Sequence, residues 1–133
     1  MCQCNLDEGY SVTIVLRCPR YTLSLPYTQP FLSRSRYARV NALKKKNKDL
    51  KTMLSVGGWN FGTQKMTAMM KTRANMNLFA RTSIKYLRER NFDGLDLDFE
   101  YPGSRGSPST DKHKFTVLLS VSTTGERSLN ARL

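Results

Sequence analysis

The alternation of hydrophobic and polar positions predicts two buried strands and the helices that surround them. Apolar residues recur every three or four positions within 35–48 and again within 63–90, with a break near Thr72, as in amphipathic helices. Two short runs rich in apolar residues, 50–56 and 92–101, end at glycine or proline, which is typical of strands. Because a helix separates the two strands, we expect a βαβ unit with a parallel sheet and a right-handed crossover.

The two ends of the chain lack such a pattern. Residues 1–33 show no sustained periodicity and include several prolines, so we expect an irregular N-terminal extension. A further helix is expected to begin within 111–121, whereas 122–133 has no usable pattern. The sequence therefore predicts one organised segment, 34–121, between two unmatched ends.

Length and composition narrow the class of protein. The chain of 133 residues is one domain at most, and it is shorter than a closed α/β barrel, which typically takes about 250 residues. No apolar stretch approaches the ~18 residues that span a bilayer, and none is long enough for a signal-peptide core, so no membrane partner is expected. Cys2, Cys4 and Cys18 lack a fourth ligand at zinc spacing, so no metal site is expected.

Positive charge is concentrated in one segment. The formal net charge is +12, and 34–51 contains Lys or Arg at many positions with Asp49 as its sole acidic residue. No aromatic interleaving or nucleic-acid motif accompanies the run, which favours a solvated helix face and no nucleic-acid partner. The alternative is a basic interaction protein that binds nucleic acid or heparin through this segment, with an affinity that falls as salt rises.

The second predicted strand carries three carboxylates on one face. Successive side chains of a strand alternate between faces, so Asp96, Asp98 and Glu100 project to the same side. Such neighbours lie about 6 to 7 Å apart, so at least one should hold a proton near neutral pH. A protonated carboxyl beside an ionised one suits general acid catalysis on sugars. An exposed acidic edge strand or a divalent-cation site would have the same spacing.

Two stretches also have the form of family motifs. Residues 92–100 read FDGLDLDFE and fit D-G-x-D-x-D-x-E, residues 55–59 read SVGGW and fit S-x-G-G-W, and 101–108 continues as YPGSRGSP. In order and separation these motifs resemble glycoside hydrolase family 18, the chitinases and chitinase-like lectins. The resemblance runs from about Tyr37 to Leu118 and implies an α/β fold, a fragment of a (β/α)8 TIM barrel that contains about strands 3 and 4.

The resemblance implies a chitinase-type reaction on β-1,4-linked N-acetylglucosamine polymers, by substrate-assisted catalysis that retains configuration. Glu100 would protonate the glycosidic oxygen while the N-acetyl carbonyl of the substrate attacks the anomeric carbon. Asp98 would orient the acetamido group, and Asp96 would share a proton with Asp98. No cofactor is implied, and His113 is expected to be an exposed helix residue, which leaves no nucleophile triad.

The same resemblance gives roles to residues around the acids. Trp59, the only tryptophan, and Tyr101 would bind the sugar, although a sole tryptophan at this position is otherwise a core residue. Phe99 stands where active members usually carry Trp, but it faces away from the carboxylates. The structural positions of the two motifs are Gly57, Gly58, Asp93 and Gly94.

The resemblance covers only part of a barrel. Strands 1 and 2 and everything from strand 5 onward are not recognisable, so we expect a truncated domain whose open sheet edges favour self-association. Impaired hydrolysis is expected, or alternatively a non-catalytic, lectin-like chitin-binding remnant. The resemblance implies an extracellular protein whose partners are chitin or chito-oligosaccharides.

Overall fold

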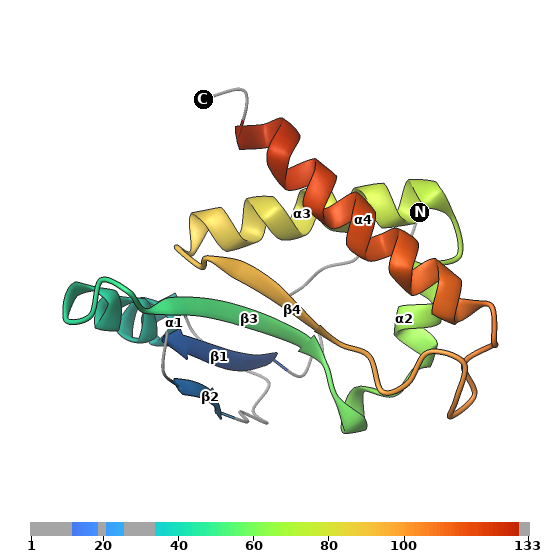
Figure 1. Ribbon diagram of the computed structural model, residues 1–133, viewed down its shortest axis with the longest axis horizontal. Helices are drawn as coiled ribbons and strands as arrows, with labels where there is room; N and C mark the ends of the chain where they lie inside the picture. The colour runs from blue at the N-terminus through green and yellow to red at the C-terminus, as the bar shows by residue number, and fades with distance from the viewer. Residues whose placement is uncertain (1–11, 19–20, 26–33, 131–133) are drawn as a thin grey trace.

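The computed structural model describes residues 12–18, 21–25 and 34–130, which form an α/β arrangement with helices against one face of a sheet (Figure 1). The strands are β1 (Val12–Cys18), β2 (Tyr21–Leu25), β3 (Lys51–Gly57) and β4 (Gly94–Asp98). The helices are α1 (Arg34–Asn41), α2 (Gln64–Met69), α3 (Arg73–Glu89) and α4 (Asp111–Asn130), with 3-10 turns at Ala42–Lys45 and Trp59–Phe61.

The predicted βαβ unit is present. β3 and β4 are parallel and joined through α2 and α3, with Leu54 opposite Leu95 and Val56 opposite Leu97. These apolar pairs share one face of the sheet because paired residues point to the same side. Figure 1 shows α3 and α4 together on one side of the sheet. Asp96 and Asp98 alternate with Leu95 and Leu97 along β4, so they belong to the opposite face.

The residues of α3 that are buried in the core between the sheet and the helices have the predicted helical spacing. Thr72 begins α3 as its N-cap, with its hydroxyl accepting a hydrogen bond from the backbone N–H of Asn75 at 3.1 Å. Met76, Ala80 and Leu87 of α3 are buried, which confirms this face. The main cluster of buried residues comprises Val56, Met66, Met69, Met70, Met76, Phe79, Phe99 and Leu118.

The first predicted helix is shorter than expected. α1 ends at Asn41 and continues only as the 3-10 turn at 42–45. The side chain of Asn41 is buried and donates to the carbonyl of Arg90 at 2.6 Å, so it anchors the helix end instead of facing solvent. Tyr37 packs edge-on against Phe92, but Leu43 is 40% exposed and does not belong to the expected apolar face.

The expectation of an irregular N-terminal extension is wrong for 12–18 and 21–25. These residues form β1 and β2, and the sheet order is β2-β1-β3-β4, with β1 antiparallel to both neighbours. The run 12–16 is rich in β-branched residues, which suit a strand, and only two residues separate the strands, as in a hairpin. The sheet is therefore mixed, unlike the all-parallel sheet that a barrel fragment implies. The remainder of 1–33 lies outside the described residues.

Most of the segment 122–133, for which the sequence has no usable pattern, belongs to α4, which continues to Asn130. Val121 is buried one turn after Leu118, so the apolar face reaches the last residue of the segment in which a helix was expected to begin. Hydroxyl groups then bond back to carbonyls of the preceding turn: Ser122 to Leu118 at 2.9 Å and Thr123 to Leu119 at 3.1 Å. The side chains in this part of α4 are polar and bond to the backbone of their own helix. Hydrophobic periodicity therefore did not reveal that the helix continues.

Candidate active site at the end of the parallel strands

The three predicted acids lie at the carboxyl end of β4, but not all on the strand. Asp96 and Asp98 are opposite Ser55 and Gly57 of β3, on the face away from the helices. The strand ends at Asp98, so Glu100 lies two residues beyond it, whereas the sequence predicted a strand to residue 101. Phe99 is buried under the helices and packs edge-on against Phe115 of α4, at 5.6 Å between ring centroids.

The two glycines after β3 let the strand ends meet. Gly57 has φ +125°, and a β-carbon there would stand 2.0 Å from the carbonyl oxygen of Asp98. The N–H of Gly58 donates to that oxygen at 2.7 Å, and a β-carbon on Gly58 would lie 3.4 Å from Oδ2 of Asp98. The S-x-G-G-W and D-x-D-x-E stretches are therefore joined directly through Asp98.

The electrostatics of the site centre on Asp98. Burial raises the pKa of Asp98, and the charges of Glu100 and Asp96 and a side-chain hydrogen bond with Glu100 raise it further. All three carboxylates remain partly exposed. A carboxyl that binds its proton more tightly than usual, beside partly exposed acids, has the electrostatic character expected of an acid-base site.

Trp59 and Tyr101 lie near the acids and are open to solvent. Trp59 is in the 3-10 turn after β3 and is 59% exposed, and Tyr101 directly follows Glu100 and is 54% exposed. Trp59 is therefore not a core residue. The peptide bond between Glu100 and Tyr101 is cis.

Arg105, which the sequence reasoning did not single out, connects Trp59 to the acids. Its guanidinium carbon lies 3.5 Å from the centroid of the Trp59 ring. Nη1 donates to the carbonyl of Glu100 at 3.1 Å, and both terminal nitrogens lie 3.4 Å from the carbonyl oxygen of Trp59. The available signal was its place in the YPGSRGSP stretch, between Tyr101 and Gly106.

Asp111, also not singled out, anchors the loop that follows the acids. Its side chain is fully buried at the start of α4, and Oδ2 accepts hydrogen bonds from Thr67 at 2.6 Å and from Ser107 at 2.8 Å. Lys114 pairs with Oδ1 at 3.2 Å. Burial alone raises the pKa of Asp111, but the hydrogen bonds from Thr67, Ser107 and Lys114 outweigh it, so the pKa is lowered.

Asp93 lies at the other end of β4, where it connects the starts of the two parallel strands. Its Oδ2 accepts from the N–H of Thr52 at 2.7 Å and pairs with Lys44 at 2.6 Å. Burial opposes ionisation, but the bonds from Lys44 and Thr52 prevail and lower the pKa of Asp93. At Gly94 an added β-carbon would only reach ordinary contact with Met53, at 3.6 Å.

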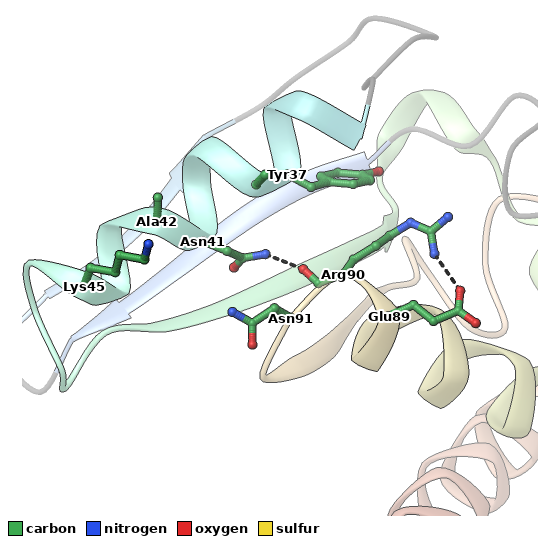
Figure 2. A pocket seen from close by; sticks show the side chains of 8 residues that line it. Tyr37, Asn41, Ala42, Lys45, Glu89, Arg90 and Asn91 are labelled. Atoms are coloured by element: carbon green, nitrogen blue, oxygen red, sulfur yellow. Dashed lines mark hydrogen bonds and ion pairs between the residues drawn. The ribbon is translucent and has the colours of Figure 1, made fainter.

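A separate pocket of about 540 Å³ lies at this opposite end, between α1 and the end of α3 (Figure 2). Figure 2 shows Asn41 bonded to the carbonyl of Arg90, whose guanidinium also pairs with Glu89 at 3.3 Å. Its lining contains none of the predicted site residues. This pocket is therefore distinct from the acids at the end of β4.

Other predicted features can be placed on the described part of the chain. His113 is exposed on α4, as expected of a helix surface residue. Within 12–18, 21–25 and 34–130, no group of three His, Cys, Asp or Glu side chains is placed to hold a metal ion. None of the helices in these ranges is long and apolar enough to cross a membrane. Cys2 and Cys4 lie outside the described residues.

Comparison with known proteins relates this site to one family. Residues 12–125 match the family model described as Glycosyl hydrolases family 18. Chitotriosidase-1 of Mus musculus is 54% identical over 83 residues, which cover 62% of this chain and 18% of that protein. The matched segment thus spans less than a fifth of the length of this curated relative.

Solved structures give the same relationship. A Group IV chitinase from Ostrinia furnacalis, in complex with allosamidin, is similar with a TM-score of 0.64 and 36% identity, over 67% of this chain and 24% of that one. Human YKL-39, described as a pseudo-chitinase with retained chitooligosaccharide binding, is similar with a TM-score of 0.64 and 31% identity, over 73% of this chain and 25% of that one.

Proposed function

Because the chain belongs to the glycosyl hydrolases of family 18, we propose that its acids cleave β-1,4-linked N-acetylglucosamine polymers such as chitin. The observation that carries the proposal is the cluster of Asp96, Asp98 and Glu100 beside the two glycines at the end of β3. In the proposed fold, β3 and β4 correspond to strands 3 and 4 of a (β/α)8 barrel.

In the proposed mechanism Glu100, the last acid of the D-G-x-D-x-D-x-E motif of the family, is the general acid; it lies two residues beyond β4 and is partly exposed. The substrate's N-acetyl carbonyl attacks the anomeric carbon, so no enzyme nucleophile is required. Asp98 orients the acetamido group, and its raised pKa suits a carboxyl that holds a proton and shares it with Asp96. No cofactor takes part in this route.

The sugar-binding surface is assigned to Trp59 and Tyr101. Both residues are more than half exposed and lie next to the acids in the loops after β3 and β4. Aromatic rings stack on the apolar face of a pyranose, so these two side chains suit chitin or chito-oligosaccharides as partners. An extracellular location is proposed with this substrate, and self-association through the edge strand β4 would supply further site residues.

A second function, chitin binding without hydrolysis, is favoured by the exposed rings alone. The similar structure of YKL-39 is described as a pseudo-chitinase that retains chitooligosaccharide binding. In this chain the acid Glu100 is present, so the hydrolase is the preferred proposal.

Release of fluorophore from a chitotriose conjugate by the full chain tests the proposal, with Glu100→Gln as the matched variant. We expect the parent to release fluorophore and the variant to lose about 100-fold or more of that rate, because proton transfer to the leaving oxygen is lost. Equal rates would refute the role of Glu100. If neither protein is active but both bind chitin beads, the non-catalytic function is the correct one.

A further inference from the structure

Trp59 presents its two ring faces very differently. The Arg105 guanidinium lies over one face, 3.5 Å from the ring centroid, yet 59% of the residue remains exposed. With one face covered, the exposed area is concentrated on the other face and on the ring edges. Trp59 therefore has one face available for stacking.

We propose that Arg105 is a positioning residue that holds Trp59 as a one-sided stacking surface, linked to the backbone of Glu100, for the apolar face of a sugar ring. The inference rests on the proposed function, because it takes an N-acetylglucosamine unit as the ligand of the open face. Arg105 itself does not contact the ligand in this proposal. Arg105 affects sugar binding only through the position of the Trp59 ring.

The hydrogen bonds of Arg105 make the link between the two loops. Nη1 donates to the carbonyl of Glu100 at 3.1 Å and lies 3.4 Å from the carbonyl oxygen of Trp59. One planar guanidinium thus joins the loop after β3 to the loop after β4. Lysine could keep the charge but not this fork of donors, since its ammonium is a single compact point of charge.

The backbone of Arg105 is also fixed, so the side chain is held at both ends. Arg105 adopts φ +52° and is followed by Gly106 at φ +84°. The hydroxyl of Thr63 donates to the carbonyl of Arg105 at 2.8 Å.

Trp59 is the only tryptophan, so the tryptophan fluorescence of the protein comes from this residue alone. We would measure acrylamide quenching in the parent, Arg105→Gln, Arg105→Lys and the control Arg81→Gln, which removes an exposed charge from α3. In Arg105→Gln we expect the quenching constant to rise about twofold as the second face opens. Arg105→Lys should give at least half of that rise, and the control should match the parent, with circular dichroism verifying that each variant is folded.

Titration with chitotriose, followed by the same fluorescence, tests the positioning role. We expect Arg105→Gln to weaken binding about fivefold, without restoration by lysine, because the ring is no longer fixed. Unchanged quenching in both Arg105 variants would overturn the inference even if chitotriose binds the parent. Increased quenching with unchanged affinity would refute the positioning role. Failure of the parent to bind chitotriose would instead refute the proposed function and the ligand, while the quenching data still decide the Arg105–Trp59 contact.

Discussion

Gly57 and Asp98 approach so closely that no side chain fits between them: a β-carbon on Gly57 would stand 2.0 Å from the carbonyl oxygen of Asp98. This approach lets the N–H of the following residue, Gly58, bond the same oxygen at 2.7 Å. Position 57 therefore needs glycine for two reasons: its φ is positive, and the backbone of the neighbouring strand leaves no room for a β-carbon. The carboxylate of Asp98 is placed by this contact.

Gly57→Ala should lower the free energy of unfolding by about 3 kcal/mol, because the added methyl must push the two strand ends apart and adopt an unfavourable φ. Urea denaturation measures the change. Gly94→Ala is the matched control, since its β-carbon would lie 3.6 Å from Met53, in ordinary contact. Equal losses in both variants would contradict the importance of the contact with Asp98.

Lys44 of the basic segment contacts the turn that leads into β4. Its ammonium pairs with Asp93 at 2.6 Å and donates to the carbonyl of Asn91 at 2.6 Å. Lys44→Ala should lower the free energy of unfolding by about 1 kcal/mol, whereas Lys46→Ala, at an exposed position, should change it by less than about 0.5 kcal/mol. Thermal or urea unfolding of the two variants and the parent measures these differences. If the lysines are equivalent, the segment is only a solvated face.

Local periodicity explains which parts of the fold were predictable. The strand, helix and strand from β3 to β4 follow from residue spacing, because burial on one face leaves a period of two or of 3.6 in the sequence. The shared face of Asp96 and Asp98 follows from the same alternation. The position of Glu100 beyond the strand does not, since the alternating pattern continues after the last ladder pair.

The features that could not be predicted depend on segments far apart in the chain. β1 is a strand that pairs with β3, so its order depends on residues about forty positions away, and the prolines around it favoured a loop. Arg105 gains its importance only when its loop meets Trp59, 46 residues earlier. Asp111 is likewise explained only by partners brought together in three dimensions, Thr67 and Ser107.

Asp111→Asn should destabilise the protein at neutral pH by about 2 kcal/mol, because it replaces a buried, hydrogen-bonded carboxylate paired with Lys114 by a neutral amide. The folded-state pKa of Asp111 lies below its ordinary value of 3.8, so its contribution is present above that pH and is lost as pH falls through the folded-state pKa. The difference between parent and variant in urea denaturation should therefore shrink below about pH 3.8. The exposed Asp49, changed to Asn, is the control. A difference that persists at the lowest pH would point to packing rather than charge.

Asp98→Asn should act in the opposite direction. The pKa of Asp98 is raised above 3.8 by burial and by the charges of Glu100 and Asp96, so the folded protein binds this proton more tightly than the unfolded chain. The resulting stabilisation is present below pH 3.8 and is lost as pH rises through the folded-state pKa. Because the amide cannot ionise, the variant should be about 0.5–1 kcal/mol more stable than the parent at pH 7, with the difference disappearing at low pH. Urea denaturation at both pH values measures this, and a variant that is less stable at pH 7 would show that the carboxylate is held favourably in its charged form. The proposed catalytic role requires the same variant to lose activity, so a more stable and less active protein would identify Asp98 as a site where stability is sacrificed for function.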